Sequence, residues 1–524
     1  MSWSRWLVPL LVCLLQPAGA RATGFTDIGQ DIEAQSETTF LFHGALRVRG
    51  ELLYNLDLDR GPTPSGQLLF PVPLADPTSQ WLTHADLRLR TDLAAYLPVA
   101  GLAVKLRMDV LDNLGLGSTP AGTPSTTTTQ GAPPVALRVK RAYGEVLLPF
   151  GLLAAGRMGA HWGLGMLSNG GDCADCDSGD SADRIALITP LLGHLWALAY
   201  DFSSSGPFSA RHSGQRTIDL DPTDDLRSVT LAFLAARSDQ SRERRRAAGK
   251  ATVEYGLSAS YRWQDNDVPA SYLSLASPVP LTSAQVMSRG LKAAAFDAWF
   301  RLTLPALRLE AEAAVLLAEI RQTSLVPGAL LHEPMRGTQV GAALETEWTP
   351  LAGRLGVGLD FGFASGDPAP GFGAFPGTNQ AAPRAGDLDG PQASPPWDNR
   401  VDNFRFHPDY RIDRILFREI VGTVTDAFYF RPHLRCRLLE LGPGALSVSL
   451  AAVASFAVEP ESTPGMRRPL GIELDPTLAY ENALGFSAVL EYAALFPLAG
   501  LDNAQPVMKA KAAQLLRLRL LYRF

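Results

Sequence analysis

Charged and aliphatic residues alternate with a period of two along many short stretches of this chain. Between 85 and 96, Asp86, Arg88 and Arg90 share one parity, whereas Leu87 and Leu89 take the other. This period places the charges on one face of a strand and the aliphatic side chains on the other. A soluble sandwich seldom turns ladders of arginine and glutamate inward, but a membrane barrel has an apolar exterior and a polar lumen. The pattern predicts an all-β, transmembrane, antiparallel up-and-down β-barrel.

The alternating stretches and the turn residues between them predict eighteen strands. Their ranges are 38–54, 82–97, 100–112, 134–148, 151–160, 183–189, 193–204, 226–237, 251–264, 292–304, 306–321, 337–349, 353–364, 423–440, 443–458, 470–482, 484–497 and 511–524. Short turns alternate with long loops between them, which is typical of the periplasmic and outer ends of a bacterial barrel. Both chain ends then share the periplasmic side, which requires an even count, and one misjudged hairpin would make it sixteen.

The start of the chain predicts export. Residues 1–22 contain a basic Arg5, a short apolar run from Trp6 to Leu15, and a small-residue cleavage site at Ala18-Gly19-Ala20 or Ala20-Arg21-Ala22, as a cleaved signal peptide does. We expect 23–37 to be a periplasmic segment and 38–524 to form the barrel. No later stretch approaches the eighteen or so apolar residues of a membrane-spanning helix. These features predict the outer membrane of a Gram-negative bacterium, with outer-membrane lipid as a partner and a compartment that permits disulfides.

The last strand carries a second targeting signal. Tyr522, Leu520 and Leu518 share the parity of the final Phe524, and arginines lie on the other face. An amphipathic strand that ends in an aromatic residue resembles the signal by which outer-membrane proteins are recognised by the barrel-assembly machinery. We therefore predict that machinery as a partner.

Two further stretches resemble a known family. They run from Arg157-Met158-Gly159 through His161-Trp162-Gly163 to Cys173-Ala174-Asp175-Cys176-Asp177, and from Phe404-Arg405-Phe406-His407 to Arg418-Glu419-Ile420-Val421-Gly422. They are similar to an uncharacterised family of predicted outer-membrane proteins from myxobacteria and related deltaproteobacteria, which brings no established activity to carry over. The overall plan also resembles the eighteen-stranded alginate-export porins, whose lumen is rich in arginine.

Strand parity predicts a basic lumen. The inward positions are Arg47, Arg49, Arg88, Arg90, Lys105, Arg107, Arg138, Lys140, Arg435, Arg437, Arg517 and Arg519. Guanidinium groups bind carboxylates and phosphates in a fixed geometry and raise the local anion concentration. A wall of this kind favours small hydrophilic, anionic solutes. The competing interpretation is cross-strand pairing of these cations with carboxylates, which tightens the barrel.

The third outer loop, 161–182, combines two cysteines with several acidic residues. Cys173 and Cys176 lie close enough in sequence for a small disulfide that stiffens the loop. Its aspartates, Asp172, Asp175, Asp177, Asp180 and Asp183, suit a hard cation such as Ca²⁺, although no glutamate closes the site. Two cysteines are too few for structural zinc. A disulfide, a structural calcium ion and a solvated acidic tip remain as alternatives, and we expect no other cofactor.

The seventh outer loop, 365–422, is much longer than a connection requires. Its second half carries five basic candidates for a pore constriction, Arg405, His407, Arg411, Arg414 and Arg418. The alternative is an ordered cap that packs on the rim through Phe404, Phe406, Tyr410 and Phe417. The sequence favours neither interpretation over the other.

Three functions follow from this architecture. The first is a porin for small hydrophilic solutes, since barrels of sixteen to eighteen strands leave an aqueous channel. The second is a plugged barrel that serves as a surface receptor or structural protein. An enzyme is the least favoured, because no nucleophile and base are recognisable from spacing. A net charge of −6 excludes a generally basic nucleic-acid binder.

Residues 238–250 are long for a periplasmic turn and rich in charge. Their composition predicts a solvated, helical turn, or alternatively a segment that contacts anionic lipid or glycan. The oligomeric state is not encoded in these patterns.

Overall fold

The structure is a computed structural model of the chain. It describes residues 24–26, 28, 37–76, 78–117, 137–206, 209–211, 217–219, 221–268, 286–324, 330–350, 353–372, 384–388, 393, 398–504 and 507–524. The predicted signal peptide (1–22) lies outside the described residues, as does most of the predicted periplasmic segment.

Eighteen antiparallel strands form one closed wall in the described part of the chain, which confirms the predicted fold class and strand count. The sequence pattern located each of them, with ends shifted by a few residues. They are β1 (Thr39–Tyr54), β2 (Trp81–Leu97), β3 (Leu102–Asp109), β5 (Arg138–Leu148), β6 (Gly151–Gly159), β7 (Ser181–Leu191), β8 (His194–Ser204), β11 (Leu226–Ala235), β12 (Thr252–Asp267), β13 (Met287–Thr303), β14 (Leu307–Ile320), β15 (Met335–Trp348), β16 (Leu355–Ala364), β17 (Ala427–Leu441), β18 (Gly444–Ala457), β19 (Pro469–Asn482), β20 (Phe486–Pro497) and β23 (Ala513–Arg523).

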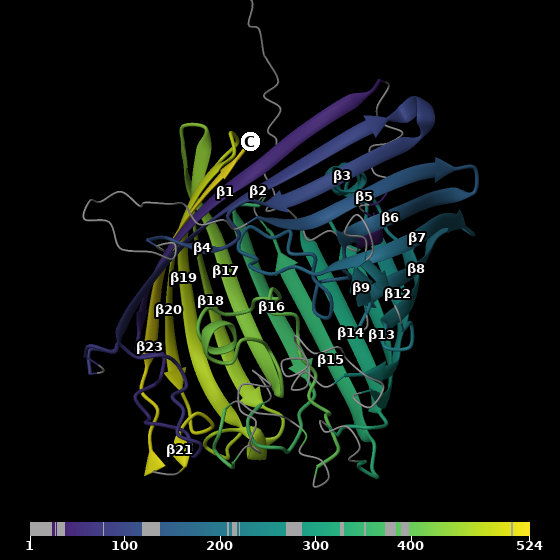
Figure 1. Cartoon of the computed structure of the whole chain (residues 1–524). Helices are drawn as coiled ribbons and strands as arrows, with labels where there is room; N and C mark the ends of the chain where they lie inside the picture. The colour runs from purple at the N-terminus through teal and green to yellow at the C-terminus, as the bar shows by residue number, and fades with distance from the viewer. Residues whose placement is uncertain are drawn as a thin grey trace, which may run out of the picture.

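The first and last strands close the barrel. β1 pairs with β23 from Ala45 opposite Arg523 to Tyr54 opposite Gln514, and Figure 1 shows purple β1 beside yellow β23. The amide of Phe524 donates to the carbonyl of Gly44 at 3.0 Å. Closure matters because an open edge strand leaves backbone N–H and C=O groups without partners.

Several short helices and strands lie in the connections between the barrel strands. They are β4 (Leu114–Gly115), β9 (Ser209–Arg211), β10 (Thr217–Asp219), β21 (Asn503–Ala504), β22 (Val507–Met508), the 3₁₀ turns η1 (Gly24–Thr26), η2 (Pro98–Ala100) and η6 (Pro460–Ser462), the short π-helix η5 (Leu416–Ile420) and helix α1 (Asp239–Ala247). Helix α1 confirms the helical turn, capped by Ser238, whose side chain accepts a hydrogen bond from the amide of Ser241. Among the described residues, no helix has the length and apolarity needed to cross a bilayer.

The two faces of the wall differ as the alternation predicts. On β8, Leu198 is 52% exposed on the outer face, whereas its neighbours Ala197 and Ala199 are buried. On β23, Leu518 is exposed, whereas Arg517 is fully buried. The outer face therefore carries large apolar side chains, whereas charged and small side chains lie on the inner face together with buried large ones such as Trp299.

Loops and wall side chains together form two hydrophobic cores inside the barrel. The first luminal cluster joins the connection between β16 and β17 to inner-face residues of β14–β20, among them Ala343, Ala364 and Ala493. The second surrounds Trp162 and Trp299 and uses alanines of β6, β7, β8 and β11. Residues 160–180, the third loop, and 365–426, the seventh loop, therefore fold inward as far as they are described.

The N-terminal segment enters the second cluster. Phe25 is buried there, and its ring lies 5.3 Å from the Arg184 guanidinium. The amide of Gly24 donates to the carbonyl of His161 at 2.6 Å. Ile28 is buried in the same cluster. Phe25 and Ile28 of the predicted periplasmic segment thus pack against the inner wall, because they are apolar and the small side chains there leave room for them, whereas Glu37 is exposed.

Candidate functional site

The predicted lumen arginines of β1, Arg47 and Arg49, share the carboxylate of Asp86 on β2. Arg49 is directly opposite Asp86 in the strand register, and its Nε lies 2.8 Å from that carboxylate. Arg47 Nη2 lies 3.2 Å from the other oxygen of Asp86. Arg88 donates to the carbonyl of Cys176 in the third loop at 2.5 Å. The wall is therefore connected to a loop at this point.

The other predicted cations on β2, β3 and β5 also have carboxylate partners. Arg90 pairs with Asp109 at 2.7 Å, Lys105 with Glu145 at 3.0 Å, Arg107 with Asp92 at 2.6 Å, and Arg138 and Lys140 reach Asp112 at 3.2 and 3.6 Å. The β3–β5 register shifts between Arg107 and Met108. Arg141, which strict alternation assigns to the outer face, lies beyond this shift and reaches Asp172 at 2.9 Å.

The predicted arginines of β17 and β23 have different surroundings. Arg435 pairs with Glu347 at 2.8 Å, and Arg437 lies beside a register shift near the short-turn end. Arg517 is fully buried between Glu51 at 2.5 Å and Glu419 at 3.1 Å. Arg519 reaches into the lumen and contacts the third loop.

The structure joins Cys173 to Cys176 by a disulfide at the tip of the third loop. Gly171 and Gly179 form the neck of this tip, both at positive φ, and a Cβ on Gly171 would lie 2.7 Å from the Gly179 Cα. Only glycine fits such a close approach in the left-handed region. The neck and the disulfide together fix where Asp175 and Asp177 point.

These two aspartates lie among five arginines, and we term the seven residues the central cluster. Two of the arginines come from β1, one from β23 and two from the seventh loop. The distances are Arg47–Asp177 2.7 Å, Arg49–Asp177 3.1 Å, Arg49–Asp175 3.4 Å, Arg411–Asp177 2.6 Å, Arg411–Asp175 3.2 Å, Arg418–Asp177 3.9 Å and Arg519–Asp175 3.2 Å, and Arg418 also contacts Asp175. Residues far apart in the sequence thus converge at one site.

Electrostatics keep both loop carboxylates ionised. Burial raises the pKa of Asp175, but the positive charges of Arg418, Arg519 and Arg411 outweigh burial and hold the pKa well below its ordinary value. The pKa of Asp177 is lowered in the same way, against burial, by Arg411, Arg49 and Arg47. Protonation therefore does not loosen the central cluster near neutral pH.

The other constriction candidates in the seventh loop lie at different places. His407 Nε2 lies 3.3 Å from Asp180. Arg414 donates to the Thr477 hydroxyl at 2.6 Å and lies 3.4 Å from Asp475. Arg405 forms an isolated antiparallel β-bridge with Thr425 through the backbone, and burial lowers the pKa of the Arg405 guanidinium. Of the five candidates, Arg411 and Arg418 join the central cluster.

The aromatic residues of the same loop pack against the inner wall. Phe404, Phe406, Tyr410 and Phe417 are all buried in the first luminal cluster. Phe404 and Phe406 meet edge to face at 5.8 Å, and Phe404 lies over Gly341 of β15. The aromatic side chains therefore pack on the inner wall and not on the rim, where the predicted cap placed them, and a pore constriction by the arginines stays a prediction.

Two wall glutamates anchor the loops through backbone amides, and strand parity alone did not single them out as anchors. Glu473 of β19 accepts hydrogen bonds from the amides of Arg414, Ile415 and Leu416 at 2.8, 2.8 and 3.0 Å. Glu312 of β14 accepts from the amides of Leu164, Met166 and Leu167 at 2.5, 3.4 and 3.3 Å. Both glutamates are almost completely buried. Each carboxyl group thereby gives three backbone amides an acceptor that they would otherwise lack.

The aspartates predicted as calcium ligands are spread along the loop. Asp172 contacts Arg107 and Arg141, and Asp180 contacts His407 and accepts from the Asn169 amide. Asp183 lies in β7 and pairs with Arg157 at 2.7 Å. Calcium binding here stays a prediction.

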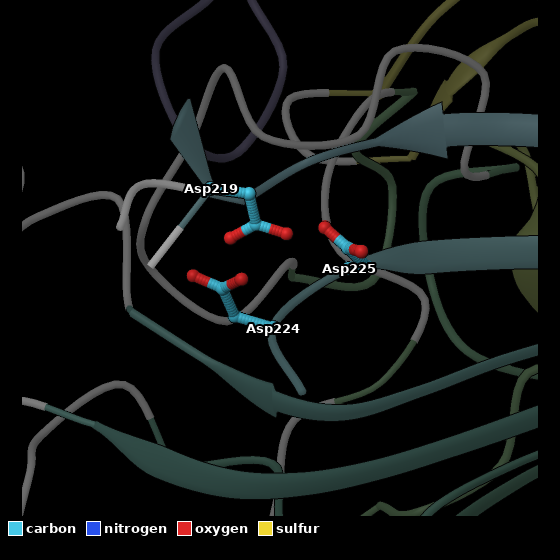
Figure 2. A group of neighbouring side chains, drawn as sticks. All are labelled: Asp219, Asp224 and Asp225. Carbon is cyan, nitrogen blue, oxygen red and sulfur yellow. The ribbon is translucent and has the colours of Figure 1, made fainter. Parts of the chain in front are cut away.

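A different acidic group lies between β10 and β11. Figure 2 shows the carboxylates of Asp219, Asp224 and Asp225 directed toward one another. Asp225 also contacts Arg227. The sequence interpretation did not single out these residues, and because clustered carboxylates alone do not define a metal site, we assign this group no ligand.

The strand pairing and the charged lumen define a membrane-type β-barrel with inward loops. No protein-family model and no curated protein sequence matches the chain. Among solved structures it is similar to OccK11 (OpdR) of Pseudomonas aeruginosa, at 13% identity and a TM-score of 0.46 over 93% of this chain and 98% of that one. It is also similar to the anion-selective porin from Comamonas acidovorans, at 10% identity and a TM-score of 0.39 over 93% of this chain and 100% of that one. The outer membrane channel DcaP of Acinetobacter baumannii has 9% identity and a TM-score of 0.37, over 94% of this chain and 98% of that one.

At these scores the barrel is defined by its own strand pairing, and its function is inferred from its own residues. The resemblances to the myxobacterial family and to the alginate-export porins stay predictions.

Proposed function

We propose that this protein is an outer-membrane channel for small hydrophilic, anionic solutes. The observation that carries the proposal is the central cluster, where arginines from two wall strands and one inward loop converge. Guanidinium groups recognise carboxylate and phosphate in a planar, bidentate geometry. Charged rings at a narrow point are one way in which pores select ions.

The location in the membrane rests on the outer face of the wall. Large apolar side chains such as Leu198, Leu257 and Leu518 are exposed there, as expected of a surface that contacts lipid. Together with the predicted signal peptide and the terminal Phe524, this face supports the outer membrane of a Gram-negative bacterium. Lipid and the barrel-assembly machinery are then the partners that we propose.

The alternative is a plugged barrel that serves as a surface receptor or structural protein. The two luminal clusters favour it, because buried aromatic residues such as Phe404 and Trp299 fill part of the interior with apolar side chains. Many lumen arginines also have carboxylate partners within the barrel. A plugged barrel does not pass solutes.

Swelling of proteoliposomes separates the two functions. Purified protein is reconstituted, and the vesicles are placed in isotonic arabinose, which is neutral, or in potassium gluconate with valinomycin, so that K⁺ follows the gluconate anion and charge stays balanced. If the protein is a channel of the proposed kind, its vesicles swell in both solutions. In gluconate they swell faster than vesicles that contain a cation-selective control pore. Swelling no faster than that of protein-free vesicles would show a plugged barrel.

A further inference from the structure

The tip of the third loop presents its two carboxylates as a small anionic ligand would. Asp175 and Asp177 share three arginines, Arg49, Arg411 and Arg418. The tip is also held from the seventh loop, since Asp409 accepts hydrogen bonds from the amides of Asp177 and Ser178 at 2.8 and 3.0 Å. Because both carboxylates contact the same guanidinium groups, the two ends of one short dicarboxylate could replace them there.

The central cluster and the buried arginines beside it carry more positive charge than their other carboxylate neighbours balance. Those neighbours are Asp86 beside Arg47 and Arg49, Glu51 beside Arg49, Asp409 beside Arg411, Glu419 beside Arg418 and Glu491 beside Arg519. Arg517 shares Glu51, Glu419 and Glu491, and Arg88 donates to the carbonyl of Cys176 on the same tip. Without the tip, seven guanidinium groups therefore face five carboxylates. If the tip withdraws, it removes two carboxylates together with the carbonyl acceptors of Asp175 and Cys176. Buried arginines left without acceptors bind a replacement anion strongly.

The tip is a discrete unit. Its neck is the close pair Gly171 and Gly179, and the Cys173–Cys176 disulfide staples the residues between them. Within the tip, residues 172–178, the contacts described above are ionic or made by backbone groups. Such contacts can be exchanged for those of a solute without exposing the hydrophobic clusters.

We propose that the pocket of Arg47, Arg49, Arg411, Arg418 and Arg519 is a binding site for a small dicarboxylate, and that the third-loop tip occupies it as a tethered competitor. The inference rests on the proposed function, for which it names the solute class and a closed state. A dicarboxylate enters by replacing Asp175 and Asp177 on the same guanidinium groups. The disulfide keeps the competing carboxylates at a high effective concentration.

Calorimetric titration of the purified full-length protein with succinate tests this directly. We expect the double variant Asp175→Asn, Asp177→Asn to bind succinate at least tenfold more tightly than the wild type. Adding Arg411→Gln to the double variant should remove most of the gain, and neutral 1,4-butanediol should not bind. Asp183→Asn removes a loop-end carboxylate that pairs with Arg157 away from the pocket, and this control should match the wild type. An unchanged succinate affinity in a folded double variant would overturn the proposal.

A second variant covers the case in which the double variant does not fold. Cys173→Ser with Cys176→Ser keeps both carboxylates but releases the staple, so succinate should bind several-fold more tightly than to the wild type. No gain would again contradict the tethered competitor. The titration needs no transport. Succinate binding without liposome swelling would therefore refute the channel alone, whereas swelling without succinate binding in the variants would refute the dicarboxylate pocket alone.

Discussion

Arg519 Nη1 lies 3.2 Å from Asp175 Oδ1, so the strand that closes the barrel also holds the tip of an inward loop. Asp175 meets Arg418 of the seventh loop at the same time. One carboxylate thereby links the barrel wall to both loops. Removing one partner of an ion pair in partly desolvated surroundings is costly, because the charge of the other partner stays buried without compensation. The loops are consequently held in the lumen by charge as well as by apolar packing.

Glu473→Ala should loosen the seventh loop. The substitution leaves the amides of Arg414, Ile415 and Leu416 without their acceptor, at a cost of about 2 kcal/mol. Hydrogen exchange of these amides should accelerate roughly thirtyfold relative to the wild type, since 1.4 kcal/mol corresponds to a factor of about ten. Glu481→Gln, an exposed site on the same strand, is the control and should leave exchange unchanged. Equal protection in Glu473→Ala would show that the anchor contributes little.

Gly341→Ala should push Phe404 off the inner wall. A Cβ at Gly341 would lie 2.3 Å from the Phe404 ring, and overpacking of this kind costs about 1–3 kcal/mol. We expect faster proteolysis within the seventh loop while the barrel remains folded. Gly50→Ala is the matched control, because a Cβ there meets nothing within 4 Å. If both variants resist protease equally, Phe404 does not pack on β15 as described.

Asp426 should make the rim sensitive to pH. Burial raises its pKa to about 7, although hydrogen bonds from the Ser462 hydroxyl and the Glu459 amide oppose the shift. A raised carboxyl pKa means that the folded state favours the protonated form. The stability that protonated Asp426 contributes to the folded state is therefore complete at a pH below the ordinary pKa of 3.8, and it is lost as the pH rises through about 7.

The expected readout is amide exchange of Val458 and Glu459, corrected for intrinsic rates. Protection should fall between pH 4 and 7 by up to about 1.4 kcal/mol per pH unit, and Asp426→Asn should remove this slope. Glu461→Gln, an exposed site in the same connection, should retain it. A flat wild-type profile would exclude a role for Asp426.

Phe524→Ala should impair assembly in cells more than folding in vitro. The Phe524 ring lies over Gly44 and 5.5 Å from the Phe42 ring, so its loss costs some packing at the closing seam. If the residue is also a recognition signal, the amount of heat-modifiable barrel in the membrane should fall several-fold, while refolding into liposomes stays near normal. Phe296→Ala, an exposed outer-face aromatic on β13, is the control. Equal assembly of both variants in cells would argue against a terminal signal.

The wall of the barrel could be predicted from the sequence because its signals are local. Alternation such as Asp86, Arg88 and Arg90 against Leu87 and Leu89 fixes which face is which, and turn residues separate one strand from the next. The same logic extends to Arg431, which shares the parity of Arg435 and pairs with Asp360 at 2.7 Å. That arginine was within reach of the sequence but was not singled out.

Other features depend on contacts that spacing does not encode. Arg141 reaches the lumen beyond a register shift, which no residue pattern marked. Glu473 acts on backbone amides of a distant loop, and such partners leave no signature in side-chain types. Asp175 and Asp177 suggested a cation site from their clustering. Their arginine partners lie on β1, β23 and the seventh loop, and only the closed barrel brings these together.

The zero-current potential of single channels in a tenfold KCl gradient across a planar bilayer tests the arginine-lined channel most directly. The convergence of arginines from the wall and the seventh loop predicts a conducting pore. Its zero-current potential should have the sign that arises when chloride permeates more readily than potassium. A potential of the opposite sign, or a protein that inserts without conducting, would contradict it.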